Sequence, residues 1–228
     1  MIRGSNLVLD FGGATLEGSS PLIAPNERQG LGVWVEGKNV TIKNLNIRGY
    51  KVALWAKNVP GLKLIGCDFS YNWKQKLLST VDREDLSDWM SYHHNEANEW
   101  LRYGAGAYLE GCNGFEVKGC KSVSGQCALM LTRSNRGLVW NNDFSFNSGL
   151  GLGMYRSSDN RIMHNKMDWC VRGYSYGIVP ISWTNRSEGE SHLKMNEMGS
   201  RYLFIILYVF LEHHLSRGDY LRDDSVEG

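Results

Sequence analysis

Proline is scarce in this chain, with 4 residues in 228, and no hydrophobic run is long enough to form a membrane helix. The longest apolar run, residues 202–211, falls well short of the roughly 20 residues that a membrane-spanning helix needs. Positive and negative side chains balance, at 25 and 24, and no cluster of lysine and arginine stands out. Because a net charge of +1 gives no field that would hold nucleic acid, we expect neither a nucleic-acid partner nor a membrane span.

Paired cysteine motifs are also missing. The five cysteines are an odd number and form no CxxC pair, so the sequence signals neither a zinc site nor a disulfide framework. We expect no metal site and interpret all five cysteines as buried apolar thiols. Cys67 and Cys120 occupy the same position of the repeat described next, a pattern that allows a disulfide between neighbouring coils without supporting one.

A repeat of about 22 residues runs through most of the chain. Its copies are centred on apolar residues separated by steps of 22, 53, 22 and 23 residues. These anchors are Ile42, Leu64, Val117, Val139 and Ile162. Further apolar residues recur two apart before each anchor, which is typical of short strands stacked coil upon coil. The sequence therefore predicts an all-β solenoid of five to six coils, with residues 6–18 as a first, incomplete coil.

The repeat also indicates the domain boundaries. The 53-residue step becomes regular if residues 73–103 are an insertion, whose apolar residues, three and four apart, predict one or two short helices. One interpretation of such an insertion is a lid or a binding loop. The alternative is a solvent-exposed helix pair without a function. The solenoid domain is predicted to span residues 1–177, followed by a non-repeat tail, 178–228, that is either a cap or aberrant. No secretory signal is visible at the start of the chain, and the two ends together favour a fragment of a longer protein.

Polar residues recur at the predicted bends, two and three positions after the anchors. They are Asn44, Asn141, Asn142, His164 and Asn165. Asparagine tolerates left-handed backbone, and its amide can bond to the next coil, so we interpret these residues as a structural ladder. His164 shares a column with Asn44 and Asn141, which favours a turn residue over a catalyst.

Two segments carry a family resemblance, GLGVWVEGKNVTIKNLNIRGY and GLGLGMYRSSDNRIMHNKMDW. They resemble the right-handed parallel β-helix proteins of the pectate-lyase-like superfamily, above all a bacterial repeat group with carbohydrate-binding domains, sugar hydrolases and a nitrous-oxide-reductase accessory factor. The resemblance covers residues 6–177. It implies an extracellular or periplasmic location for the full-length parent and a polysaccharide or oligosaccharide as partner. It implies no cofactor beyond Ca²⁺, and we expect a monomer.

The outward side chains of the first strand in each coil predict a shallow groove. An aromatic stripe of Trp34, Trp55 and Tyr108 is expected beside a wall that includes Glu110, Arg133, Tyr155 and Arg156. Sugar rings stack on such aromatic rings, and arginine pairs with uronate or sulfate groups. The same stripe also fits a purely structural ladder of stacked rings.

Two catalytic sets are compatible with this groove. A lyase would use Arg133 or Arg156 as the cation and Tyr155 or His94 as base or acid. A hydrolase would pair Glu110 with a carboxylate from the insertion, Asp82, Asp85 or Asp88. The Asp-Pro-His signature of mannuronan epimerases and the aspartate pair of polygalacturonases are absent. We expect a lyase or hydrolase acting on an acidic polysaccharide; the alternatives are a non-catalytic carbohydrate-binding or surface-structural solenoid and an inactive fragment.

Overall fold

The computed structural model describes residues 1–80, 82–83, 85, 88, 103–170 and 207. By its contacts the chain divides into a unit of residues 1–182 and a unit of residues 183–228, and the described strands belong to the first unit. Apart from one short 3₁₀ turn, Pro25–Glu27, the regular elements described in this unit are strands.

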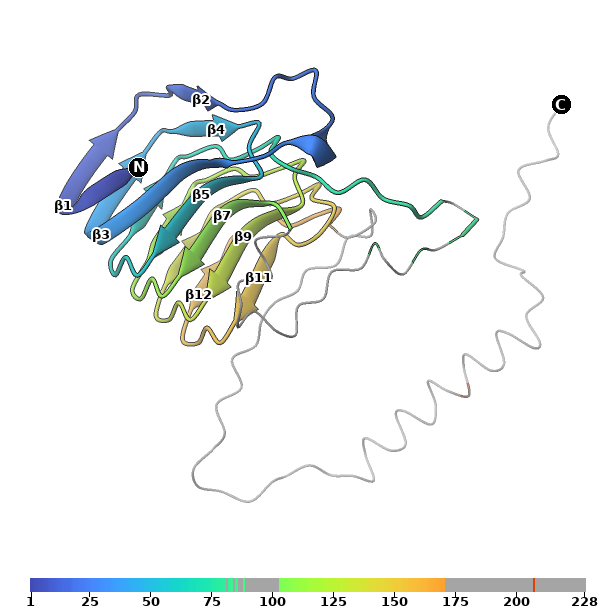
Figure 1. The fold of residues 1–228 in the computed structure, drawn as a ribbon. Helices are drawn as coiled ribbons and strands as arrows, with labels where there is room; N and C mark the ends of the chain where they lie inside the picture. Colours follow the sequence, from blue (N-terminus) through green and yellow to red (C-terminus); the bar gives the residue numbers. More distant parts are fainter. Residues whose placement is uncertain (81, 84, 86–87, 89–102, 171–206, 208–228) are drawn as a thin grey trace, which may run out of the picture. The chain divides into compact units, whose positions relative to one another are not determined.

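The strands follow one another around the coils in a fixed order (Figure 1). They are β1 (Ile2–Asp10), β2 (Thr15–Glu17), β3 (Leu31–Lys43), β4 (Asn46–Arg48), β5 (Val52–Lys57), β6 (Lys63–Ile65), β7 (Ala105–Glu110), β8 (Glu116–Lys118), β9 (Cys127–Thr132), β10 (Leu138–Trp140), β11 (Leu152–Tyr155) and β12 (Arg161–Met163). All pairings between them are parallel.

Three faces result from these pairings. The first half of β3 continues into β5, β7, β9 and β11, which we call the first face, and its second half continues into β6, β8, β10 and β12, the second face. The third face begins with β2 and β4 and continues as isolated bridges from Asn46 through Asp68, Lys121 and Asp143 to Lys166. Because one sheet curls around an axis in this way, the predicted parallel β-helix is confirmed.

The anchors predicted from the repeat lie directly above one another. Ile42 pairs with Leu64, Leu64 with Val117, Val117 with Val139, and Val139 with Ile162. Residues 64 and 117 are neighbours in space although 53 positions separate them in the chain. The helices predicted within the insertion fall mainly on residues 86–102, of which only Asp88 is described.

The N-terminal strand supplies the expected first coil. Leu9 of β1 pairs with Ile42, and Leu16 of β2 pairs with Ile47 on the third face. The core inside the coils is apolar and continuous from Val33 to Leu152. Burying each leucine-sized side chain contributes about 1.5–3 kcal/mol, and repeating that burial coil after coil is what stabilises the stack.

Left-handed backbone turns the chain after the second face of every coil. The residues at this bend have φ angles between 52° and 62°; they are Asn44, Gly66, Gly119, Asn141 and His164. Glycine and asparagine tolerate this conformation best. His164 takes the same backbone conformation as its column neighbours, so its interpretation as a turn residue is confirmed.

The residue that directly follows this bend in the sequence holds the coils together through its side chain. Asn142 accepts a hydrogen bond from the Cys120 N–H at 2.8 Å and donates to the Val117 carbonyl at 3.0 Å. Asn165 repeats the pattern one coil later with Asn142 N–H and the Val139 carbonyl. The carbonyl that accepts is in each case that of an anchor residue. The predicted asparagine ladder is therefore confirmed, and its amides satisfy backbone groups that would otherwise be buried unpaired.

The adjacent residues Asn141 and Asn142 provide a matched test of these two roles. We expect Asn142→Ala to lower the free energy of unfolding by about 2–4 kcal/mol, because it leaves a buried N–H and a buried carbonyl unpaired. Asn141→Gly should change it by less than about 0.5 kcal/mol, since glycine already occupies that column at two coils. Urea denaturation of both variants measures the difference, and similar losses for the two would contradict the assignment.

Candidate functional site

The aromatic stripe forms on the outer side of the first face. Trp34 pairs in register with Trp55, and Trp55 with Tyr108. The two tryptophan rings meet edge to face with centroids 4.5 Å apart, while Trp55 and Tyr108 stack with centroids 5.7 Å apart. Tyr108 is only 1% exposed, whereas both tryptophans are partly exposed. The stripe therefore offers its tryptophan end to solvent and holds its tyrosine inside a small apolar cluster.

A row of polar side chains runs beside the stripe, where the strands of the first face end. Lys57, Glu110, Thr132 and Tyr155 lie in register on β5, β7, β9 and β11, and Arg133 and Arg156 follow directly in the chain. We call these six residues the polar wall. The structure thus brings together four of the predicted site residues, Glu110, Arg133, Tyr155 and Arg156.

Glu110 is the buried charged residue of the polar wall, with its side chain 8% exposed. Its carboxylate lies 3.1 Å from Arg133 Nη2 and 3.7 Å from Lys57 Nζ. Both cations are far more exposed, at 42% and 39% of their side chains. A carboxylate at this depth needs such partners, because an unpaired buried charge is strongly destabilising.

Both arginines of the polar wall adopt backbone conformations that arginine seldom takes. Arg133 and Arg156 have φ angles of 49°, at a bend that Asn58 and Gly111 occupy in the preceding coils. The left-handed region costs a residue with a Cβ atom about 1–2 kcal/mol. Glycine would fit this bend without strain. Arginine at both positions therefore points to a function that needs two cations at the ends of neighbouring strands.

Hydrogen bonding and ring contacts complete the polar wall. The Tyr108 hydroxyl and Thr132 Oγ1 are 3.3 Å apart, and the Arg156 guanidinium lies 5.3 Å from the centre of the Tyr155 ring. Cation–π contacts of this kind hold an arginine in place while leaving its charge available. Three cations against one carboxylate leave the polar wall with a net positive charge.

The remaining predicted catalytic residues lie elsewhere. Asp88 is buried and accepts backbone hydrogen bonds from Leu78 and Ser79, at 2.9 and 2.8 Å, so its carboxylate organises the start of the insertion. Asp82 is exposed and Asp85 partly exposed. The interactions seen for Glu110 are with cations, and those seen for Asp88 are with backbone amides. His94 lies outside the described residues.

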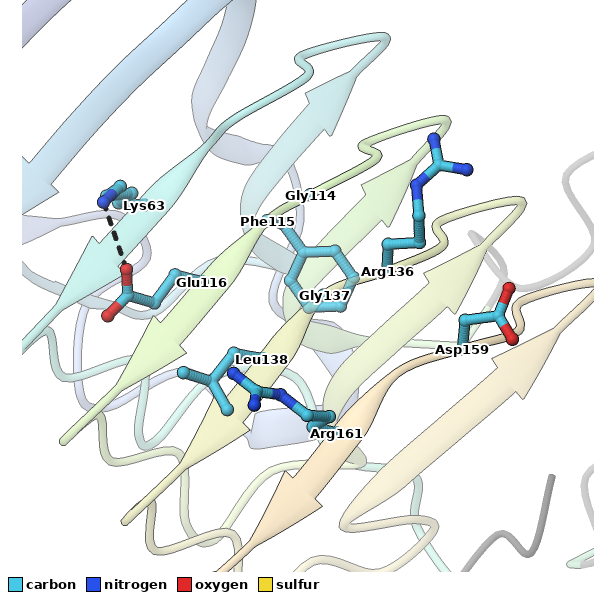
Figure 2. Close-up of a pocket in the computed structure, with 9 residues that line it drawn as sticks. All are labelled: Lys63, Gly114, Phe115, Glu116, Arg136, Gly137, Leu138, Asp159 and Arg161. Atoms are coloured by element: carbon cyan, nitrogen blue, oxygen red, sulfur yellow. Dashed lines mark ion pairs between the residues drawn. The ribbon is translucent and has the colours of Figure 1, made fainter.

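A shallow hollow of about 430 Å³ occupies the second face (Figure 2). Its charged lining comprises Lys63, Glu116, Arg136, Asp159 and Arg161, with Lys63 Nζ and a Glu116 oxygen paired at 3.2 Å. Its floor includes Gly137, where a Cβ atom would lie 2.1 Å from the buried Phe115 ring. Sequence reasoning missed this hollow, although Arg136 and Asp159 stand in the same left-handed column as Asn39 and Gly61 and could have drawn attention.

The cysteines and histidine of the described chain form no metal centre of three or more ligands. All five cysteines are buried, as predicted. Burial raises the pKa of Cys112 and of Cys127 to about 12, so both are protonated at neutral pH, whereas metal binding needs the thiolate. His164 sits at an exposed bend with its ring edge-on to Trp140. No helix in the described residues is long and apolar enough to cross a membrane.

Comparison with known proteins gives one family match. A family model described as "Periplasmic copper-binding protein (NosD)" matches residues 35–201, which is most of the chain. Two structures of trypsin-treated QnrB1, a plasmid-mediated fluoroquinolone resistance protein, show 11% identity. One alignment covers 73% of this chain and 81% of that chain with a TM-score of 0.21, and the other covers 72% and 79% with a TM-score of 0.20. Scores this low support no inference. No curated protein matches the chain.

The strain at Arg133 and its ion pair with Glu110 can be separated by a double-mutant cycle. In the wild-type background we expect Arg133→Gly to destabilise the protein by about 1–3 kcal/mol, because Glu110 loses its closest cation. In a Glu110→Gln background the same change should be neutral or stabilising by up to about 1 kcal/mol, because only the relief of strain remains. Urea denaturation of the four proteins tests this; a loss of equal size in both backgrounds would contradict the pairing.

The buried thiol of Cys127 makes stability depend on alkaline pH. Its pKa rises on folding from an ordinary 9.0 to about 12, so the folded state retains a proton that the unfolded state has lost. Its contribution is therefore complete below about pH 9 and falls by about 1.4 kcal/mol per pH unit as the pH rises toward 12. We expect Cys127→Ala to flatten the alkaline decline in unfolding free energy, measured by urea denaturation below and inside this window. An unchanged slope would contradict the prediction.

Proposed function

The chain belongs to the NosD family, and on that premise we propose that residues 1–170 form an extracellular or periplasmic β-helix that binds an acidic polysaccharide along the polar wall. Binding without catalysis is the function that the geometry supports best. The observation that carries the proposal is the pair of strained arginines, Arg133 and Arg156, which together with Lys57 outnumber the single carboxylate of Glu110.

The spacing of these cations suits a polymer with regularly placed negative groups. Lys57 ends β5, and Arg133 and Arg156 directly follow β9 and β11; β7, which carries Glu110, lies between β5 and β9, and neighbouring strands are about 4.8 Å apart. A chain of uronate or sulfated sugars lying across the coils would meet a cation at three of these four strands. Trp55 and Trp34, partly exposed beside the polar wall, are available to neighbouring sugar rings.

Glu110 favours binding over hydrolysis. A glycoside hydrolase needs two carboxyl groups facing the bond that is cleaved, one of them protonated. Glu110 is paired with two cations, Lys57 and Arg133, and Asp88 is engaged by backbone amides. A polysaccharide lyase remains a second candidate, because Tyr155 and Arg156 lie together in the polar wall as a base and a cation would.

Copper, which the family's description names, does not fit the described residues. Cu(I) is held by thiolate or thioether ligands and Cu(II) by imidazole and oxygen ligands. The cysteines are buried, two of them with strongly raised pKa values, and His164 is the one histidine in the described part of the chain. We therefore assign no copper chemistry to this part of the protein.

Removing the two outer cations tests the proposed binding. We expect Lys57→Ala with Arg156→Gly to weaken binding to polygalacturonate about 5- to 30-fold, since each exposed ion pair contributes up to about 1 kcal/mol. Arg133 stays, so Glu110 keeps a partner. The matched control, Lys63→Ala with Arg161→Ala on the second face, removes the same charge and should leave affinity unchanged. Calorimetric titration at two salt concentrations, with neutral dextran as reference ligand, measures the effect. Equal losses for both variants would show non-specific attraction.

The same preparations distinguish binding from catalysis. Incubation with polygalacturonate should release neither unsaturated nor reducing sugar ends if the protein only binds. Unsaturated ends that disappear in Tyr155→Phe would replace the binding proposal with a lyase. Absence of binding to every acidic polysaccharide tested would overturn both.

A further inference from the structure

Cys67 and Cys120 occupy equivalent places in the two coils that flank the insertion. The residues that follow them, Asp68 and Lys121, form a parallel bridge, and the Lys121 N–H donates to the Cys67 carbonyl at 2.9 Å. Both residues face the apolar core, where they are 1% and 2% exposed. The pair is thus in register and inward-facing.

This geometry meets the requirements of a disulfide. Adjacent parallel strands are about 4.8 Å apart, and disulfides join residues whose Cα atoms are about 4.4–6.8 Å apart. Register sets this pair apart from Cys112, beside which the neighbouring coil places Ser134; the Ser134 Oγ accepts a hydrogen bond from the Cys112 N–H at 3.0 Å.

We propose that Cys67 and Cys120 form a disulfide when the protein folds in an oxidising compartment outside the cytoplasm. This inference rests on the location implied by the family and on the register of the two buried cysteines, and it is independent of any polysaccharide. A disulfide is uncharged, and therefore compatible with the apolar core that surrounds both residues. One Cu(I) ion between two thiolates would instead leave a net negative charge buried there.

The reaction is a thiol–disulfide exchange with a protein disulfide as oxidant. The Cys67 thiolate attacks one sulfur of the oxidant, forming a mixed disulfide and releasing the other sulfur as a thiolate. The Cys120 thiolate then attacks the Cys67 sulfur and releases the oxidant as a dithiol. Two electrons pass to the oxidant and the two cysteines lose two protons.

The bond would close a loop that contains the whole insertion. Between Cys67 and Cys120 lie residues 73–103, the long excursion from the solenoid. Cross-linking the ends of such a loop restricts the unfolded chain, which stabilises the folded state. Because the thiols are buried once the coils have closed, the exchange takes place during folding and the finished bond is protected from reductants.

Counting thiols in the exported protein tests the proposal. We expect three free thiols rather than five in denaturant without reductant, an intact mass lower by two hydrogens, and a peptide in which Cys67 is linked to Cys120. Unfolding in denaturant with dithiothreitol should occur at a lower midpoint than without it. The variant Cys67→Ala with Cys120→Ala should lose this dependence, whereas Cys112→Ala should keep it.

Three results would overturn the proposal. They are five free thiols in correctly folded protein, a disulfide that joins other cysteines, and stoichiometric Cu(I) binding that requires both Cys67 and Cys120 in place of the bond. Circular dichroism of each variant confirms that the β-sheet has formed. If the double variant does not fold, the thiol count and the peptide map of the wild-type protein decide the question unaided.

Discussion

The in-register stacking of one coil on the next is the constraint on which the rest of this structure depends. Each backbone group of a coil must find its partner directly above or below, so every copy of the repeat has to turn at the same places. Left-handed residues recur at those turns, from Asn44 to His164, and the side chains just inside them bond to the carbonyls of the anchors. A side chain can therefore be replaced only by one that keeps the turn conformation and these hydrogen bonds.

The same constraint explains why the polar wall stands out. At the bend that follows the first face, the early coils use Asn58 and Gly111, as the backbone prefers, while the later coils use Arg133 and Arg156. Those arginines gain nothing from the conformation itself. Arg133 lies beside a buried carboxylate, Glu110, and Arg156 beside an aromatic ring, so this bend places positive charge at the ends of two neighbouring strands.

The period of the sequence predicted whether a side chain points into or out of the coil. It did not predict whether neighbouring side chains bury it. It placed the anchors, the asparagine ladder and His164 correctly, because these depend only on register. Tyr108 was expected on an open stripe and is 1% exposed, and Glu110 was expected on a wall and is buried between two cations. Both departures arise from contacts between side chains of neighbouring coils. The opposite charges of Lys57 and Glu110 in one column were the available signal for the second.

The ladder at the anchors also shows where the stack is least secured. In the later coils, Asn142 and Asn165 each make one bond as donor and one as acceptor to the coil before. In the earlier coils the same places hold Cys67 and Cys120, whose thiols reach the carbonyls of Ile42 and Leu64 at 3.6 and 3.4 Å as weak donors. This weaker rung falls at the junction interrupted by the insertion, where the closure of a long loop is most costly. Of the two junctions that the amide ladder does not reach, a covalent bond between the two thiols would secure the one that the insertion interrupts.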